Sequence, residues 1–355
     1  MKRLESLDWL RGVLAVSIML YHLTSWKLHH PGAGELLGRL GIYGVAMFFL
    51  VSGLSMATGY CKYINDSRTA LKFYIRRIFR IWPLLWFSIA TVTVGGVIMK
   101  GHSVDWFLIF LNVTTLFGFI SPGAYVNTGA WSIGNEMVYY AMTPIVILTY
   151  NRSVFFGNIL VIATALVGAH FGFVSISRER TLEEQWQMYI NPFNNLFFYC
   201  TGIAIYYNAS KLAIRASTIV ALLLASVSVI LFSPVEGDLV NIVTGFNRLI
   251  FYFACTVLVL AIYKMGFRFA RWLSTSLTAI GVASYGVYLL HPIVFQLVGL
   301  SVREFDIANY PYFIIGLTSA LTVVVALVLY SRLEAPLIRL GKRLTTVEPN
   351  VAIAT

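Results

Sequence analysis

The sequence predicts an all-α membrane protein that crosses the bilayer about ten times, with both termini in the cytoplasm. Three observations support this prediction. Of the 355 residues, 58% are hydrophobic and only 12% are charged, whereas charged residues make up about a quarter of an ordinary soluble domain. Apolar runs long enough to cross a bilayer recur from end to end. Lys and Arg, which give a formal net charge of +11, gather in alternate connections, as in loops that face the cytoplasm.

The expected spans are separated by short polar connections. The start Met1–Arg3, followed by an apolar run, is similar to a signal peptide, but no small-residue cleavage site follows it. The first run is therefore expected to remain as a span. In chain order, the spans are residues 9–27, 40–60, 82–100, 133–150, 154–174, 192–208, 216–234, 247–263, 276–299 and 311–331.

A further apolar stretch, residues 106–120, is shorter and contains Asn112 and two threonines. Charge decides whether it spans. The connection 61–80 holds six basic residues against Asp66 alone, so it should be cytoplasmic. Without 106–120 as a span, the other basic connections fall on that same side. The stretch is therefore expected to be re-entrant or to lie at the outer interface. The basic connections concerned are Arg152, 211–215, 264–271 and 332–343, and the acidic or mixed loops 175–191, 235–246 and 301–310 then face outward.

No linker, repeat or low-complexity tract divides the chain. A single membrane domain is expected over residues 1–344, followed by a flexible cytoplasmic tail at 345–355. The three cysteines, Cys61, Cys200 and Cys255, form no CxxC motif, so neither a disulfide framework nor a metal site is expected. No basic tract alternates with aromatic residues, which argues against nucleic acid as a partner.

The first span carries two polar side chains that face the same way. Arg11 and His22 are eleven positions apart, which is about three helical turns plus 20°, with a rise of roughly 16 Å. Charged groups inside membrane spans are rare and mark polar pathways. One interpretation is a polar path through the bilayer. The other is an arginine that reaches the interface and a histidine bonded to a neighbouring helix.

Two later spans bring further titratable groups to the outer half of the bilayer. Glu136 lies in the first turns of a span that runs inward from Trp131, and His291 comes about four turns into a span that runs outward. We expect both at a depth similar to that of His22. Pro292 removes a backbone donor, which is tolerated where freed carbonyls find partners beside a cavity.

On the cytoplasmic side, residues 69–83 predict a basic amphipathic helix that ends at Trp82–Pro83. Lys72, Arg76 and Arg80 repeat every four residues, and Arg77 precedes Arg80 by three. Such a helix either rests on anionic lipid headgroups or forms an anion site, because guanidinium groups match phosphate well. Glu334, just after the last span, is either a helix-end feature or a partner of these arginines; pairing is the favoured interpretation.

Taken together, five motifs resemble the acyltransferase-3 family of bacterial inner-membrane enzymes. They are LDWLRG with Arg11 and His22, the R-x-x-R of Arg77 and Arg80, WSIGNEMVYY, SYGVYLLHP, and the Y-x-x-x-E-x-P of Tyr330, Glu334 and Pro336. They follow the family's order over nearly the whole chain. The sequence differs from the family's motifs at a few positions, such as Trp9, where the family often has glycine. These differences do not affect the residues expected to carry the chemistry.

The resemblance implies transfer of an acyl group, most often acetyl, from cytoplasmic acyl-CoA to a hydroxyl of a surface carbohydrate. In this hypothesis Arg76, Arg77 and Arg80 hold the donor's phosphates, and Arg11 guides its pantetheine arm. His22 is the general base. Glu136 orients His22 or holds the sugar, and His291 stabilises the oxyanion or forms part of the acceptor pocket. The remaining substrate-binding candidates are Trp131, Ser132, Tyr285 and Glu334.

Two other functions fit the composition. A transporter of a lipid-linked sugar or a small anion would use buried His and Glu to relay protons, although no inverted repeat supports it. A non-catalytic membrane partner gives no reason for buried ionisable groups. Within the enzyme hypothesis, a covalent acyl-histidine step stays open beside direct transfer.

Overall fold

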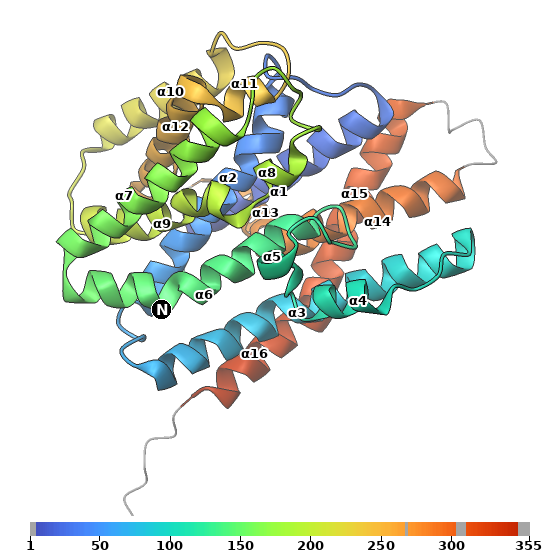
Figure 1. Ribbon diagram of the computed structural model, residues 1–355, viewed down its shortest axis with the longest axis horizontal. Coiled ribbons are helices and arrows are strands. Elements are labelled where there is room, and N and C mark those ends of the chain that lie inside the picture. The colour runs from blue at the N-terminus through green and yellow to red at the C-terminus, as the bar shows by residue number, and fades with distance from the viewer. Residues whose placement is uncertain (1–4, 267–268, 303–309, 347–355) are drawn as a thin grey trace, which may run out of the picture.

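The computed structural model describes residues 5–266, 269–302 and 310–346, and all regular structure within these ranges is helical (Figure 1). The predicted all-α class is confirmed for this part of the chain. The helices are α1 (Glu5–Lys27), α2 (Leu36–Tyr60), α3 (Ser67–Lys100), α4 (Trp106–Val113), α5 (Phe117–Ile120), α6 (Ala130–Arg152), α7 (Val154–His170), α8 (Trp186–Tyr189), α9 (Pro192–Ala209), α10 (Ala216–Phe232), α11 (Val240–Val243), α12 (Gly245–Lys264), α13 (Arg271–Val282), α14 (Ser284–Ser301), α15 (Pro311–Leu329) and α16 (Ala335–Leu344). Short π-helices extend α7 (Phe171–Ser175) and join α15 to α16 (Tyr330–Glu334).

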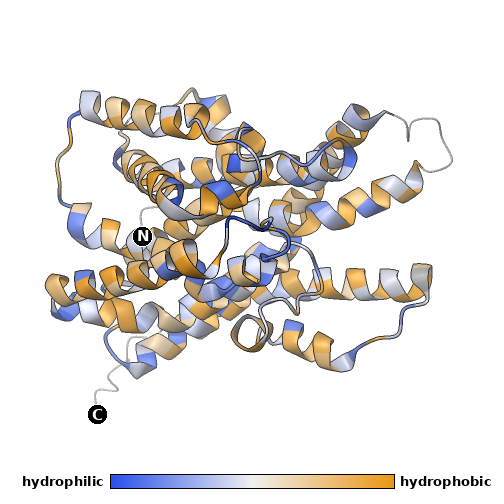
Figure 2. Cartoon of the chain, turned by 45° about the horizontal axis from the view of Figure 1, so that its top comes forward, coloured by the Kyte–Doolittle hydropathy of each residue, from blue (hydrophilic) through white to orange (hydrophobic). Residues whose placement is uncertain are grey.

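Six helical segments of the described chain are long and apolar enough to cross a membrane: α2, α3, α7 with its π-turn, α12, α14, and α15 through α16. Helix α10 is apolar but shorter, and α1, α6 and α9 are long enough but less apolar. Figure 2 shows hydrophobic residues, in orange, along much of the length of the helices. A multi-pass membrane protein accounts for these features, whereas ten crossings with both termini in the cytoplasm stays a prediction.

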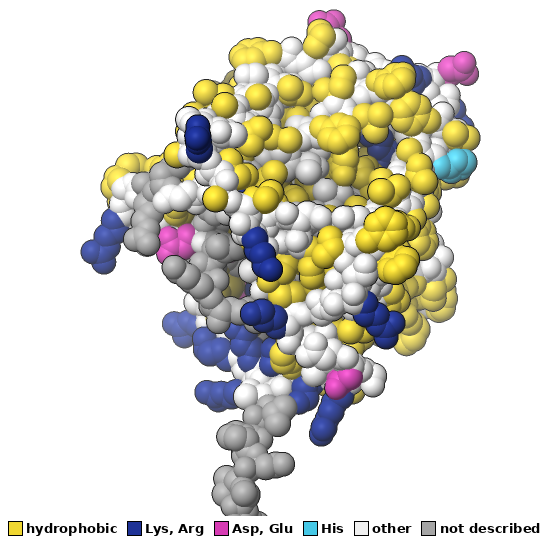
Figure 3. Space-filling view, turned by 90° about the vertical axis from the view of Figure 1, so that its left-hand side faces the viewer, with side chains coloured by type: hydrophobic (Ala, Val, Ile, Leu, Met, Phe, Trp, Pro, Cys, Tyr) yellow, Lys and Arg dark blue, Asp and Glu magenta, His cyan; other side chains and the backbone are white. Residues whose placement is uncertain are grey.

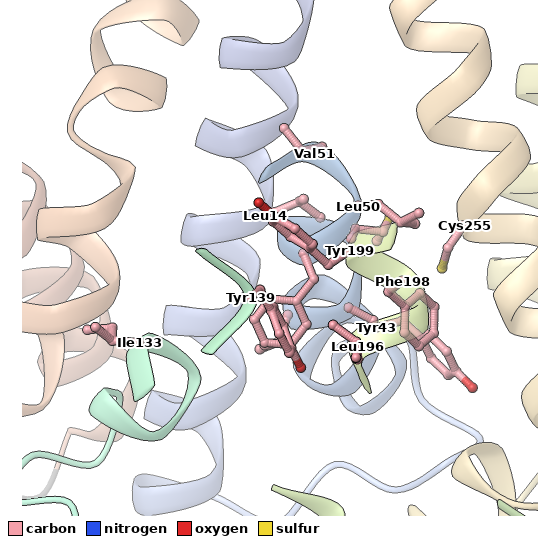
Figure 4. Close-up of a cluster of buried hydrophobic side chains, with 14 of the residues drawn as sticks. Leu14, Tyr43, Leu50, Val51, Ile133, Tyr139, Leu196, Phe198, Tyr199 and Cys255 are labelled. Atoms are coloured by element: carbon pink, nitrogen blue, oxygen red, sulfur yellow. The ribbon is translucent and has the colours of Figure 1, made fainter. Parts of the chain in front are cut away.

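Helix α2 forms the centre of the bundle. In its apolar window 83% of the residues are buried, against 17% in α7. It packs closely on α9 because glycines meet backbone there: a Cβ on Gly53 would collide with the carbonyl of Tyr199, and one on Gly202 with that of Leu50. Small residues let membrane helices approach in this way. Around this crossing, Figure 4 shows the buried side chains of Leu50, Tyr199 and their neighbours.

The basic helix does not end at Trp82–Pro83, so that prediction was wrong. It continues into the expected third span as one helix of 34 residues with Pro83 inside it. A proline removes one helical hydrogen bond, but membrane helices tolerate this because neighbouring groups satisfy the freed carbonyl. The helix begins at a capping box in which Asp66 accepts from the Thr69 backbone N–H.

Two other stretches differ in detail from the expected spans. The ninth span, predicted as continuous over 276–299, is interrupted at Ala283 between α13 and α14. There Gly281 lies directly against the backbone of Asp8, so α13 packs along the start of α1. Residues 106–120 form two short helices, α4 and α5, neither of which is long enough to cross a bilayer. This fits a segment that does not span.

Of the tail expected at 345–355, Thr345 is buried and hydrogen-bonded to Arg76. Residues 347–355 lie outside the described residues.

Candidate active site

A cavity of about 820 Å³ lies between α1, α2, α3, α6, α14 and α16. Seven of the residues singled out from the sequence line it: Arg11, Arg76, Arg77, Arg80, Ser132, Glu136 and Tyr285. The cavity follows α2 from Val45 to Tyr60, a distance of roughly 22 Å at the helical rise of 1.5 Å per residue. The cavity is therefore elongated along α2.

One end of the cavity is strongly basic. Arg76 and Arg77 come from the first half of α3, and Arg80 is one turn further along. Figure 3 shows the end of the molecule where α3 begins and α6 ends, and Lys and Arg side chains gather over the lower half of this face. We call this end of the cavity the basic mouth and define it by Arg76, Arg77, Arg80 and Lys342.

Aromatic rings hold two of these arginines in place. The Arg77 guanidinium donates to the Tyr60 hydroxyl at 3.0 Å and lies within 6 Å of the Tyr60, Phe73 and Tyr140 ring centres. Arg76 lies 4.6 Å from the centre of the Tyr63 ring. Cation–π contacts of this kind fix a guanidinium without neutralising it. Both charges therefore stay available to an anion in the cavity.

Arg11 and Glu136 lie deeper in the cavity and have partners of their own. Arg11 donates to the Ser55 hydroxyl at 3.0 Å, and its other terminal nitrogen is 3.7 Å from Asp8. Glu136 accepts from the Ser52 hydroxyl at 2.6 Å and from the Tyr140 hydroxyl at 2.5 Å. Glu136 is thus held by two hydroxyls beside the arginines, and no hydrogen bond in the described chain joins it to His22 or His291.

His22 and His291 form a pair of their own. The Nδ1 of His22 is 2.8 Å from the Nε2 of His291, and the two rings stack with centres 5.0 Å apart. Trp26 stacks on both rings, at 5.4 and 5.8 Å. The predicted similar depth of the two histidines is thus seen as direct contact between helices α1 and α14, and their side chains face the protein interior.

The hydrogen bonds of this pair decide which nitrogens carry protons. His291 Nδ1 is 3.2 Å from the carbonyl oxygen of Val287, which only accepts, so Nδ1 carries the proton. In a neutral imidazole the other nitrogen is then an acceptor, so His291 Nε2 accepts from His22 Nδ1–H. A neutral His22 consequently presents an unprotonated Nε2, which is the form that a general base requires.

The histidine pair does not line the cavity but adjoins its inner end. Tyr288, which does line the cavity, is three residues before His291, and the two ring centres are 6.2 Å apart. The Tyr288 hydroxyl accepts from Ser132 at 2.9 Å. Tyr288 therefore lies next to both the arginine-lined cavity and His291.

The remaining candidates lie around this centre. Trp131 is buried and packs on Trp186 and Tyr189, outside the cavity lining. Tyr285 donates to the carbonyl of Ile81 at 2.9 Å. Glu334 is 1% exposed, and its carboxylate has no hydrogen-bond partner among the described residues, although Arg80 acts on it electrostatically. No ion pair joins Glu334 to an arginine among the described residues, so the expected pairing stays a prediction.

His29 lies in the connection between α1 and α2 and forms a hydrogen bond there. It lies 2.8 Å from the carboxylate of Glu35, and this hydrogen bond holds the pKa of Glu35 below its ordinary value. The pair ties residue 29 to the start of α2.

Sequence reasoning missed several residues of the site. Tyr140 follows Glu136 by four residues and Tyr288 precedes His291 by three, so helical periodicity could have indicated both. Ser52 and Ser55 sit on α2 in an ordinary apolar span, and no sequence signal pointed to them. Trp26 is one turn after His22 and was likewise not predicted as part of the site.

Comparison with known proteins gives a consistent result. The sequence profile of the acyltransferase-3 family, described as an acyltransferase domain, matches residues 4–329. The chain is 26% identical over 310 residues to a protein of Komagataeibacter xylinus named as a membrane-bound transacylase, BcsY, covering 81% of this chain and 72% of that protein. It is 25% identical over 191 residues to nodulation protein 10 of Rhizobium leguminosarum bv. viciae, covering 46% of this chain and 50% of that protein. No solved structure matches.

Proposed function

The chain belongs to the acyltransferase-3 family and is an acyltransferase, and we propose that it carries an acyl group across the bacterial inner membrane from cytoplasmic acyl-CoA to a carbohydrate hydroxyl. The acyl group proposed is acetyl, and the acceptor is a cell-surface glycan or a related sugar at the outer face. The observation that supports this best is the elongated cavity, which has arginines at one end and adjoins an imidazole pair at the other.

In this proposal the basic mouth binds the phosphates of the donor. Acyl-CoA carries a diphosphate and a ribose phosphate, and arginine forks match phosphate oxygens well. Arg11 lies further in, so it guides the pantetheine arm toward the histidines. Ser132, Tyr285 and Glu136 form polar walls along this path.

His22 is proposed as the general base. Its Nε2 takes the proton of the acceptor hydroxyl while the oxygen attacks the thioester carbonyl carbon. The tetrahedral intermediate then expels the CoA thiolate, and the protonated His22 returns its proton to that sulfur. A positioned base of this kind contributes typically 10²–10⁴-fold. His291 fixes the tautomer and the ring orientation of His22, a role that the sequence analysis had considered for Glu136.

The other candidates receive supporting roles in the proposal. Trp131 belongs to an aromatic cluster with Trp186 and Tyr189, and such clusters suit contact with sugar rings. Glu334 is a positioning residue that acts on Arg80 through its charge. Neither touches the reacting atoms.

Purified protein in lipid nanodiscs with radiolabelled acetyl-CoA and a sugar acceptor tests the proposal. We expect release of free CoA with transfer of label to the sugar, and loss of both in His22→Ala. In the same protein reconstituted into sealed liposomes, entry of label without CoA release would indicate a transporter. Incubation without acceptor separates two mechanisms: an increase in protein mass by one acetyl group, absent in His22→Ala, would demonstrate an acyl-histidine intermediate.

A further inference from the structure

We propose that the C-terminal helix α16 forms one wall of the donor entrance and that Lys342 binds the ribose phosphate of acyl-CoA. This inference rests on the proposed function and adds a binding residue to it.

The face of α16 that lines the cavity is regular. Ile338 and Lys342 line the cavity and are spaced four residues apart on α16, so their side chains lie within about 40° of one another. Thr346, two residues beyond the end of the helix, also lines the cavity. Helix α16 packs on α3 in the structure (Figure 1). One side of this helix therefore faces the basic mouth, and Arg343, next to Lys342, does not line the cavity.

Specific contacts hold α16 at the mouth. Arg76 donates from Nε to the Thr345 hydroxyl at 2.6 Å, and that hydroxyl donates to the Gly341 carbonyl at 2.9 Å. Gly341 allows close approach, because a Cβ at this position would lie 2.6 Å from the Cβ of Phe79. The last turn of α16 is therefore fixed beside Arg76, with Lys342 at the same level.

The charge of the mouth is not balanced by its own residues. The two acidic residues that line the cavity are Asp8, next to Arg11, and Glu136, held by Ser52 and Tyr140. Among the described residues, the Lys342 ammonium has neither a hydrogen-bond partner nor an ion pair. An exposed, unpaired ammonium beside three guanidinium groups favours a multiply charged anion.

The orientation of the donor then identifies which phosphate Lys342 binds. The thioester must reach the histidine pair beyond Tyr288, so the nucleotide end of the donor lies at the opposite end of the cavity. Arg80 and Arg77 are deeper along α3 than Arg76, which suits them to the diphosphate. Lys342 lies at the mouth with Arg76 and Thr346, so it is the cation placed to bind the ribose phosphate.

Isothermal titration of the full-length protein in nanodiscs with CoA and with dephospho-CoA, which lacks the ribose phosphate, tests this assignment. We expect Lys342→Gln to weaken CoA binding roughly tenfold, as for loss of one hydrogen bond between charged groups, and to leave dephospho-CoA binding unchanged. Lys342→Arg should retain most of the affinity. Arg343→Gln is the matched control because it removes the same charge from the adjacent position, and it should bind CoA like the unmodified protein.

A second variant tests the wall itself. Gly341→Leu should push α16 away from Phe79 and weaken CoA binding even though Lys342 is intact. Equal weakening of both ligands in Lys342→Gln, or no weakening of either, would overturn the assignment. If the unmodified protein bound neither ligand, the proposed function would fail instead, so the two failures are distinguishable.

Discussion

The hydrogen bond between His22 and His291 leads to a graded prediction. His291→Leu replaces the imidazole with a branched apolar side chain and removes the acceptor of the His22 Nδ1 proton. A buried donor left without a partner costs about 1–3 kcal/mol, which corresponds to roughly 5- to 150-fold in rate at 1.4 kcal/mol per factor of ten. His22→Ala removes the base itself and should cost about 10²–10⁴-fold. His291→Gln retains an acceptor oxygen and should fall between the unmodified protein and His291→Leu.

The assay is CoA release by purified protein in nanodiscs at saturating acetyl-CoA and acceptor, measured as kcat across pH. Thermal unfolding of each variant checks that the bundle is intact. CoA binding should be unchanged in all three variants, because neither histidine lines the cavity.

Two results would contradict this reasoning. If His291→Leu were as inactive as His22→Ala, His291 would take part in the chemistry itself. If His291→Leu retained full activity with an unchanged pH profile, the hydrogen bond would not set the tautomer of His22.

Three further predictions address the donor site, the packing and the topology. Arg77→Ala should weaken CoA binding at least tenfold, measured by titration. The control Arg152→Ala, at the exposed end of α6, should bind CoA like the unmodified protein. If Arg77→Ala also bound CoA like the unmodified protein, Arg77 would have only a structural role. Gly53→Leu should lower the unfolding temperature strongly, because a side chain there meets the Tyr199 carbonyl and overpacking costs about 1–3 kcal/mol or more; an unchanged temperature would mean that α2 and α9 can separate. In intact cells, Glu183→Cys, in a loop expected outside, should react with an impermeant maleimide, and Lys211→Cys, in a loop expected in the cytoplasm, should not. Background labelling should be low because the native cysteines are buried. The opposite labelling pattern would mean that the predicted topology is inverted.

The sequence was sufficient for features that depend on local chemistry. The length of the apolar runs predicted the helices. The four-residue spacing on α3 predicted that Arg76 and Arg80 lie on one face of the helix, and both side chains line the cavity. Helix geometry also predicted that Arg11 and His22 face the same way. These inferences need only the helical repeat and the cost of burying charge.

Features that depend on contact between distant segments could not be predicted. His22 and His291 are 269 residues apart, and their depth suggested proximity but not a shared hydrogen bond. Glu136 was expected near the histidines, yet Ser52 on α2 holds it beside the arginines, and nothing in the sequence of α2 marks that serine. The continuity of α3 through Pro83 depends on neighbouring helices, since proline interrupts a helix in isolation.

Under the proposed function, helix α1 would allow one protein to use a donor and an acceptor from two compartments. Arg11 and His22 are fixed on one rigid helix at a separation of roughly 16 Å, and α1 also packs on α2, α13 and α14. In the proposed mechanism the donor occupies the cavity from the basic mouth to Tyr288, and the histidine pair lies beyond Tyr288 under Trp26. Donor and acceptor therefore need to meet only at His22. Only the acyl group has to pass between the two sides, and neither the charged nucleotide nor the sugar has to cross the hydrocarbon core, where each buried charge would cost at least about 2.5 kcal/mol.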